Sequence, residues 1–182
     1  DGTVKWKTSL NCGVLDQGGV AIDKDETVYV TVKSTLGESN GGIVALNGQT
    51  GAIKWKYAIP EDVTGTVAID QAGNVHFGTD KGNYFIIKND GSEDPVIVKR
   101  DLTALILESE STYATGWVQG KAKCWSSPVI ADDGTIYIGI TNMETRSKSL
   151  LLALKHQNVT GLQTGAPWPM KAQNRRHTNV QP

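Results

Sequence analysis

Short apolar runs separated by polar turns recur along the chain, and their spacing predicts β-hairpins. The clearest stretch is 43–56, reading IVALNGQTGAIKWK, in which two apolar runs flank a turn that contains Gly48 and Gly51. Glycine accepts positive φ without steric cost and so permits such a turn. In the second run, isoleucine, tryptophan and tyrosine alternate with lysine, which places the large side chains on one face of a strand.

Hairpins of this kind repeat at long intervals. VAIDKDETVYVT at 20–31 resembles VAIDQAGNVHFGT at 67–79 and VIADDGTIYIGIT at 129–141. Each copy is an apolar strand, a polar turn and an alternating strand. Further strands are predicted after each copy, third strands at 43–46, 84–87 and 150–154 and fourth strands at 53–58, 96–99 and 162–168.

The first residues resemble the end of a unit. DGTVKWK matches TGAIKWK at 50–56, so Trp6 aligns with Trp55. A repeat of about 45 to 50 residues with four strands per unit is typical of propeller blades. The predicted fold class is therefore all-β, a partial β-propeller of about three four-stranded antiparallel blades plus one orphan N-terminal strand. The expected single domain, 1–182, divides into the last strand of a preceding blade at 1–9, blades at 18–58, 65–100 and 126–170, an insertion at 101–124 and a tail at 171–182.

The insertion and the loops near it are the predicted binding region. Leu102, Leu105 and Ile106 could line one side of a short helix, and an irregular flap is the alternative. Loops carry most function on scaffolds of this kind. The expected binding surface is the loop-bearing end near 11–18 and 112–125.

Composition excludes some partners. The formal net charge is −1, with 18 basic and 19 acidic residues, so no strong field favours nucleic acid. No apolar run approaches the ~20 residues that a membrane span needs. The chain begins at Asp1 rather than Met, which fits a processed or truncated form. Cys12 and Cys124 could form a disulfide in an oxidising compartment, and two separate thiols are the alternative.

Acidic turns have the chemistry of a calcium site without its pattern. Asp23, Asp25 and Glu26 could suggest calcium, which takes about six to eight oxygens. Their spacing lacks a complete loop pattern, so a solvated hairpin turn is predicted instead. The same prediction applies to Asp132-Asp133-Gly134.

The remaining polar groups favour structural roles. His76, His156 and His177 show no ligand spacing, and His76 is predicted to be packed or hydrogen-bonded on a strand. Ser126-Ser127-Pro128 is predicted to begin a strand. A basic tail could touch an acidic partner, although a solvated terminus is favoured; it contains Lys171, Arg175, Arg176 and His177. Asn158-Val159-Thr160 is a formal glycosylation sequon.

The repeat resembles the tryptophan-docking motif of pyrroloquinoline-quinone (PQQ)-like β-propellers. ALNGQTGAIKWK fits the pattern Ala-x-Asp-x-x-Thr-Gly-x-x-x-Trp at Ala45, Asn47, Thr50, Gly51 and Trp55, with asparagine in place of aspartate. DGTVKWK, SSPVIADDGTIYIGI and PWPM resemble other parts of such quinoprotein-like repeats. Units two and three depart from the motif, so their packing must use other side chains. The resemblance implies the C-terminal part of a propeller that would be completed by missing blades of a longer chain or by a second copy of this chain.

The resemblance also implies candidate functions. Quinone-dependent dehydrogenases of this family hold PQQ with calcium, but no cofactor residue can be matched here, so PQQ and calcium are expected only in a full-length context. We expect no catalytic residue and no metal ligand in this chain. The predicted function is a non-catalytic binding or scaffold module for a protein or glycan, outside the cytoplasm. The alternatives are a fragment of a quinone-dependent dehydrogenase and an assembly role like that of outer-membrane propeller lipoproteins.

Overall fold

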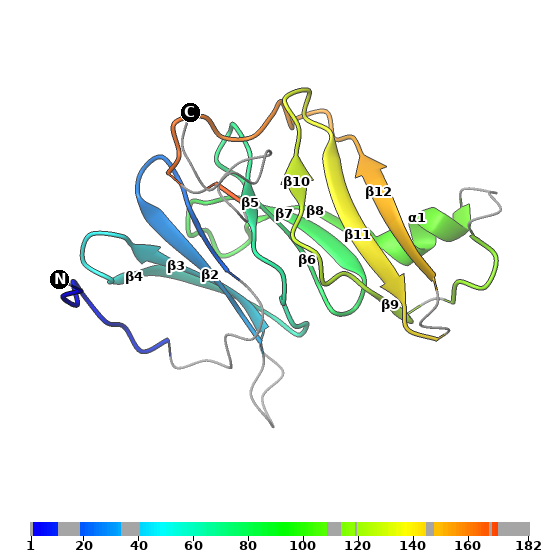
Figure 1. Cartoon of the computed structure of the whole chain (residues 1–182), viewed down its shortest axis with the longest axis horizontal. Coiled ribbons are helices and arrows are strands. Elements are labelled where there is room, and N and C mark those ends of the chain that lie inside the picture. The colour runs from blue at the N-terminus through cyan, green and yellow to red at the C-terminus, as the bar shows by residue number, and fades with distance from the viewer. Residues whose placement is uncertain are drawn as a thin grey trace.

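Three antiparallel β-sheets stand side by side and make up almost the whole molecule (Figure 1). The computed structural model describes residues 2–10, 19–33, 41–108, 114–118, 120–144, 148–167 and 169–170. Each sheet has four strands in the described part of the chain, and the sheets are open. This arrangement confirms the predicted all-β partial propeller. Among the described residues, no helix is both long and apolar enough to cross a membrane.

The first two sheets follow the chain strand by strand. Sheet 1 has the order β1-β2-β3-β4, with β1 (Val20–Ile22), β2 (Thr27–Val32), β3 (Gly41–Asn47) and β4 (Ile53–Ile59). Sheet 2 has the order β5-β6-β7-β8, with β5 (Ala68–Ile69), β6 (Val75–Gly78), β7 (Asn83–Ile87) and β8 (Val96–Asp101). The helix α1 (Leu102–Glu108) follows β8 directly, so the first part of the insertion is helical rather than an irregular flap.

Sheet 3 is built differently. Its central path is β10 (Val129–Ile130), β11 (Ile136–Asn142) and β12 (Lys148–Leu154), and β9 (Ala122–Lys123) also pairs with β11. Since β12 covers one edge of β11 along its whole length, β9 and β10 must share the other edge. Sheet 3 therefore has three strand positions across its width, where sheets 1 and 2 have four.

The fourth strand predicted at 162–168 is wrong for sheet 3. Leu162 instead forms a bridge with Asp70, and the backbone of Ile69 donates to Pro169 O and accepts from Gln163 N. Ile69 is fully buried, and its backbone groups need partners that this segment supplies. Proline cannot donate within a ladder, so the segment is a poor central strand but can lie along the edge of β5. Trp168 lies outside the described residues.

Residues 2–10 form no strand, although the sequence predicts an orphan strand at 1–9. A strand needs a neighbour to take up its ladder hydrogen bonds, and the described chain places none beside this segment. Trp6 instead lies against the turn between β3 and β4, where its Nε1 donates to Gly48 O at 2.9 Å and its ring meets Gly51. Trp55 makes the corresponding contacts one sheet later, with Asn89 Oδ1 at 3.2 Å and with Gly91.

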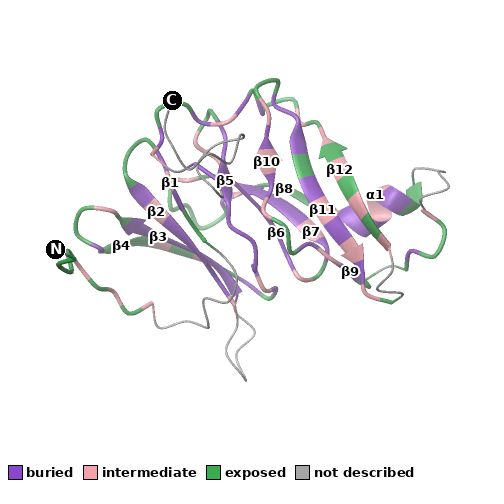
Figure 2. Ribbon diagram, viewed as in Figure 1, coloured by how far each residue is buried: buried purple, intermediate pink, exposed green. Residues whose placement is uncertain are grey.

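The core consists of the layers between sheets. We call the face turned toward the next sheet along the chain the forward face, and its opposite the backward face. The forward face of sheet 1 packs on the backward face of sheet 2, which presents Ile69, Val75, Phe77, Phe85 and Ile87. The forward face of sheet 2 packs on the isoleucines and leucines of β11 and β12. Figure 2 shows the middle strands buried, whereas β12 alternates between exposed and half-buried residues.

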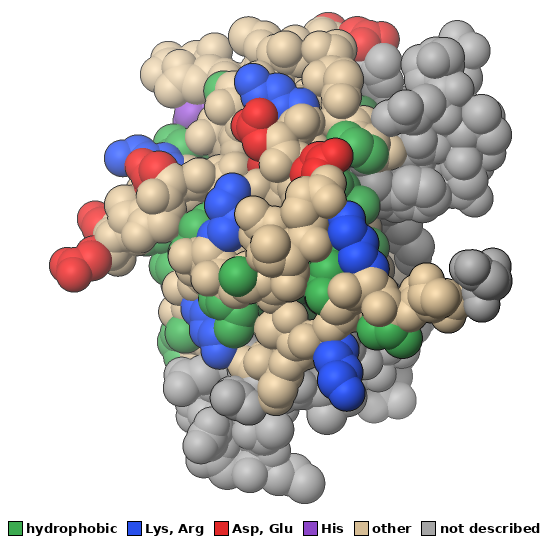
Figure 3. Space-filling model, turned by 90° about the vertical axis from the view of Figure 1, so that its left-hand side faces the viewer, with side chains coloured by type: hydrophobic (Ala, Val, Ile, Leu, Met, Phe, Trp, Pro, Cys, Tyr) green, Lys and Arg blue, Asp and Glu red, His purple; other side chains and the backbone are tan. Residues whose placement is uncertain are grey.

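The backward face of sheet 1 is partly covered by the N-terminal segment. Val30, Val32, Val44 and Leu46 form a small cluster to which Trp6 and Leu10 add their side chains. Figure 3 views the molecule from this side and shows lysine side chains interspersed among apolar ones.

Candidate functional site

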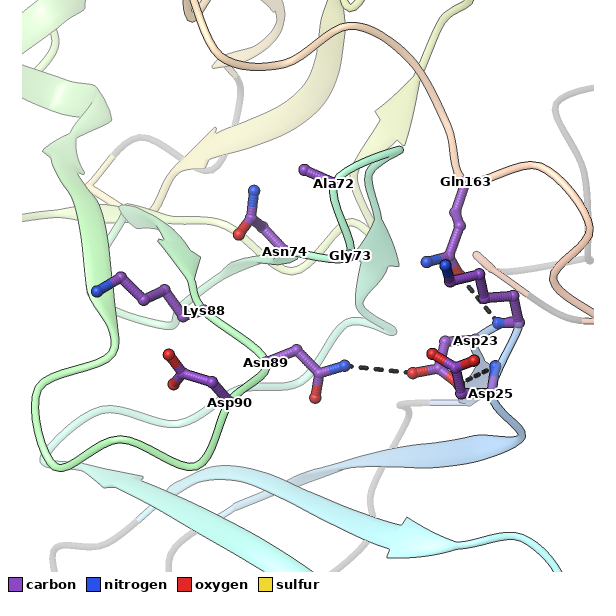
Figure 4. A pocket seen from close by; sticks show the side chains of 10 residues that line it. Asp23, Asp25, Ala72, Gly73, Asn74, Lys88, Asn89, Asp90 and Gln163 are labelled. Carbon is purple, nitrogen blue, oxygen red and sulfur yellow. Dashed lines mark hydrogen bonds between the residues drawn. The ribbon is translucent and has the colours of Figure 1, made fainter.

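A polar cleft of about 390 Å³ lies between the hairpin turns of sheets 1 and 2 (Figure 4). Three turns form it, those of β1-β2, β5-β6 and β7-β8, together with one residue of the C-terminal segment. Its volume falls in the range of small-molecule and peptide-side-chain sites. The lining residues are Asp23, Lys24, Asp25, Ala72, Gly73, Asn74, Lys88, Asn89, Asp90 and Gln163.

Asp23 anchors one wall of the cleft. Its Oδ1 accepts hydrogen bonds from the backbone N–H groups of Asp25 and Thr27, at 2.9 and 2.7 Å. Its Oδ2 accepts from Tyr29 Oη at 2.7 Å and from Asn89 Nδ2 at 3.2 Å. Burial, followed by the hydrogen bond to Asp23, raises the pKa of Tyr29, so its hydroxyl keeps its proton. The bond from Asn89 joins the β7–β8 turn of sheet 2 to the β1–β2 turn of sheet 1, and it fixes the two walls relative to each other.

A second buried network supports the β5–β6 turn of sheet 2. His76, fully buried, lies between Asp70 Oδ2 at 3.0 Å from Nε2 and Tyr84 Oη at 2.5 Å from Nδ1. Burial lowers the pKa of His76, so the ring is neutral. Its Nε2–H then donates to Asp70, and its Nδ1 accepts from Tyr84, whose pKa burial raises well above its usual value.

Asp70 is itself held as a carboxylate. Burial alone would raise its pKa, but hydrogen bonds from His76 and Asn74 outweigh it and the pKa of Asp70 lies below its usual value. Asn74 donates to Asp70 through both its backbone N and its Nδ2, at 2.8 and 2.9 Å. The cleft residue Asn74 is therefore fixed by a network that reaches the next sheet interface.

Polar side chains line two opposite walls of the cleft. Figure 4 shows Lys88 and Asp90 on one side, Asp25 and Gln163 on the other, and Asn89 between them. Gln163 is buried, and its Oε1 accepts from Lys24 N at 3.0 Å. Lys24 of the β1–β2 turn also lines the cleft, so the lining contains two amines, Lys24 and Lys88, and two exposed acids, Asp25 and Asp90, together with amide groups. This arrangement can hold a polar ligand through hydrogen bonds and two charge pairs.

Asp23, the buried one of the acidic residues weighed for calcium, has other partners. All of the acceptor positions described for Asp23 are taken by N–H and O–H donors of the protein. No group of three or more His, Cys, Asp or Glu residues suited to a metal occurs among the described residues. This donor set does not fit a calcium–quinone site.

The turn at 132–134 lies on sheet 3, with Asp132 and Asp133 exposed and Gly134 buried. Hydrogen bonds from Thr135, followed by the bond from Lys155, hold the pKa of Asp133 below its usual range. Asp133 Oδ2 also pairs with Lys155 Nζ at 3.0 Å. The structure does not bring this turn to the cleft.

The other residues singled out from the sequence are scattered. Ser127 Oγ accepts from Thr66 N, and β10 begins directly after Pro128 as predicted. Asn158 is exposed, and its N donates to the half-buried His156. Cys124 is a free thiol whose pKa burial raises to about 12. Cys12 and the basic residues Lys171, Arg175, Arg176 and His177 lie outside the described residues.

The described residues of the predicted binding surface do not line the cleft. Residues 11–18 and 112–113 lie outside the described part. Within the remainder, Trp117 is buried in the core beside sheet 3, while Val118 and Trp125 are exposed. The cleft was missed because its residues come from turns far apart in sequence. Asn89 and Gln163 carry no motif, and only the repetition of Asp23 at Asp70 hinted at a shared role for these turns.

Comparison with known proteins identifies a fold. No family model matches this chain, and no curated protein matches its sequence. The crystal structure of BamB from Moraxella catarrhalis matches at a TM-score of 0.51 and 18% sequence identity, covering 89% of this chain and 39% of that one. The chain thus spans well under half the length of that structure. At this identity the likeness shows the fold alone, and the chain is similar to BamB as a propeller-type array of antiparallel sheets.

Proposed function

We propose that this chain is a non-catalytic scaffold that binds a segment of another protein in the polar cleft. The observation that carries this proposal is the pair of charged walls held at fixed separation by the Asn89–Asp23 hydrogen bond. The β1–β2 and β5–β6 turns are held by buried Asp23 and Asp70, and Asn89 bonds the β7–β8 turn to Asp23, so little ordering is needed when a ligand binds. An extended peptide with one acidic and one basic side chain matches the two walls, and its backbone matches the amides between them.

The setting we propose is outside the cytoplasm, in outer-membrane assembly. The likeness to BamB supports this setting, together with the sequence resemblance to outer-membrane propeller lipoproteins. The partners predicted from the sequence remain part of the proposal, either missing blades of a longer chain or a second copy. A fragment of a quinone-dependent dehydrogenase remains the alternative function, in which PQQ and calcium would be held only in a full-length context.

An array of extended peptides tests the proposal. We expect saturable binding to peptides that carry both charges, and a Lys24→Ala/Lys88→Ala variant should weaken it about tenfold, since each wall loses its amine. Lys121→Ala is the matched control, because this exposed lysine lies away from the cleft and pairs with Glu144.

Four results would contradict it. Absence of saturable peptide binding would exclude the peptide ligand, as would equal binding by the double variant and the control. Binding to a glycan array alone would replace the protein ligand by a glycan. Saturable uptake of PQQ with calcium, followed by absorbance and dye reduction, would favour the dehydrogenase.

A further inference from the structure

Sheet 3 has an open edge at the position where the other sheets carry an outer strand. The strands β4 and β8 cover β3 and β7. In the part of the chain that the structure describes, β12 pairs with β11 alone. The segment that follows β12 turns away and joins β5. An edge strand with unpaired backbone groups is a ready template for another strand.

Residues 2–10 show the opposite situation. They match an outer strand in sequence, but in the described chain they have no sheet to join and form no strand. Trp6 donates to Gly48 O and packs on Gly51, as Trp55 of β4 donates to Asn89 and packs on Gly91. Trp6 therefore already stands where the outer strand of a preceding sheet would place it. The sheet that should accompany it would have the shape of sheet 3, with its outer position empty.

Equivalent residues define how the two would pair. In sheet 1, Tyr29 pairs with Ala45, which pairs with Trp55. In sheet 3, Tyr137 pairs with Ala153, and no residue of the described chain takes the next position. The sequence match of Trp6 to Trp55 puts Trp6 opposite Ala153.

In sheet 1, Tyr57 lies opposite Ile43, two residues away from the pair of Trp55 and Ala45. The equivalent step from Trp6 and Ala153 puts Thr8 opposite Leu151. Trp6 would then approach Tyr137 as Trp55 approaches Tyr29, whose ring centroids are 6.0 Å apart.

The exposure of apolar side chains supports the same pairing. Leu151 and Tyr137 are exposed on the forward face of sheet 3, at 72% and 39%. The pairing would place both at the seam. Isolated exposed apolar residues are common on proteins, but a group of them on one face indicates a contact.

We propose that residues 2–10 of one copy of this chain form the outer strand of sheet 3 in a second copy. The contact is head-to-tail and continues the stacking already present, with the forward face of sheet 3 packed on the backward face of sheet 1. Such contacts close into a ring when the rotation allows it. Two copies bring together six sheets, within the roughly four to eight of known propellers, whereas three copies bring nine. For the 182-residue chain this contact predicts a closed dimer.

Light scattering and sedimentation of the 182-residue chain test this assembly. We expect twice the monomer mass of 19.6 kDa. Leu151→Glu should raise the dimer dissociation constant at least about tenfold by placing a charge in the seam. Leu107→Glu, at an exposed leucine of α1, is the matched control and should leave the dimer intact.

Cross-linking tests the register. In a Cys12→Ser background, Thr8→Cys and Leu151→Cys chains are mixed and mildly oxidised. Opposed strand residues lie about 4.5 to 5.5 Å apart, within reach of a disulfide. The mixture should yield a covalent dimer joining the two variants, and neither variant alone should do so.

Several outcomes would overturn the proposal. A folded chain of monomer mass at all concentrations would do so, and so would a dimer that Leu151→Glu and Leu107→Glu affect equally. Failure of the mixed variants to cross-link while circular dichroism shows native sheets would exclude this register. A monomer that still binds peptides would leave the proposed cleft function standing, because the cleft and the seam share no residue.

Discussion

The forward faces of sheets 1 and 3 share one register and differ in what covers them. Tyr29 and Ala45 pair in sheet 1 as Tyr137 and Ala153 do in sheet 3. Tyr29 is buried against sheet 2 and bonded to Asp23, whereas Tyr137 is exposed. The same strand pattern therefore yields a core layer or a surface, depending on whether another sheet stands beside it.

Sheet 2 differs from sheet 1 in the side chain that its outer strand places on the forward face. In sheet 2, Val98 takes the position that Trp55 has in sheet 1. Trp55 pairs with Ala45 and Val98 with the equivalent Ile86, each just after the bulge of its outer strand. The space that a smaller side chain leaves beside sheet 3 is filled by Leu102, Ile106 and Trp117. The insertion thus takes over packing that the repeat performs in sheet 1.

The largest expected effect comes from Trp55, whose ring contacts Tyr29 and Gly91. Trp55→Ala should lower the free energy of unfolding by about 3 kcal/mol, because it removes this large ring. Val98→Ala, at the equivalent position of sheet 2, should lower it by about 1 kcal/mol. Urea unfolding followed by circular dichroism measures both. Equal effects would mean that α1 and Trp117 do not substitute for a tryptophan.

Two equivalent glycines separate a covered face from an open one. An added Cβ at Gly78 would overlap the Cys124 side chain, whereas at Gly139 the nearest atom to such a Cβ is Ser126 Oγ at 3.2 Å. Gly78→Ala should therefore destabilise the chain by about 2 kcal/mol. Gly139→Ala should change stability by less than about 1 kcal/mol. Thermal unfolding of the two variants side by side checks this order, and a reversed order would contradict the stacking of sheets 2 and 3.

The two tyrosines sharpen the comparison. Tyr29 donates a hydrogen bond to the buried carboxylate of Asp23, whereas the ring of Tyr137 is exposed. Tyr29→Phe removes that bond and should destabilise the chain by about 1.5 kcal/mol. Tyr137→Phe should change the unfolding free energy by less than about 0.5 kcal/mol. Denaturant midpoints distinguish the two, and a large effect of Tyr137→Phe would show that the forward face of sheet 3 is covered.

The last prediction concerns pH and the interface of sheets 2 and 3. Burial lowers the pKa of His76, so the unfolded chain takes up this proton first as the pH falls. Stability should therefore decline below about pH 6.5, by up to ~1.4 kcal/mol per pH unit, until the folded-state pKa is reached. His76→Gln should abolish this part of the slope, which urea midpoints between about pH 7.5 and 4.5 would show. Identical slopes in both proteins would contradict the assignment.

Asp70 acts in a separate, more acidic window. Its pKa is lowered in the folded state. Its contribution to stability is therefore present above its unfolded pKa of about 3.9 and is lost as the pH falls further. The His76→Gln comparison is therefore unaffected by Asp70 at the upper end of the range.

Local pattern predicted the hairpins well and the ends of the repeat poorly. Alternation around Trp55 and the Asp23 and Asp70 turns correctly indicated antiparallel strands, because these patterns depend on neighbouring residues alone. The strand expected at 162–168 was wrong because apolar residues there serve a different sheet. Pairing partners are chosen by three-dimensional competition, and Ile69 offered buried backbone groups that the sequence does not reveal.

The candidate cleft was beyond sequence reasoning for the same kind of reason. Lys24, Asn89 and Gln163 come from three distant segments, and the cleft exists only where their turns meet. The buried hydrogen-bond partners of His76 could not be predicted from the sequence either. His76 could be placed on a strand, but its bonds to Asp70 and Tyr84 depend on the side chains that surround it in the folded state.

The sequence by itself determined the repeating hairpins and the face of each strand that would be apolar, since both follow from residue spacing and turn chemistry. The tertiary structure decided which faces became core and which stayed open. It also decided where the last segment paired and which polar groups met in a cleft, because stacking sheets and satisfying buried backbone groups are properties of the whole chain.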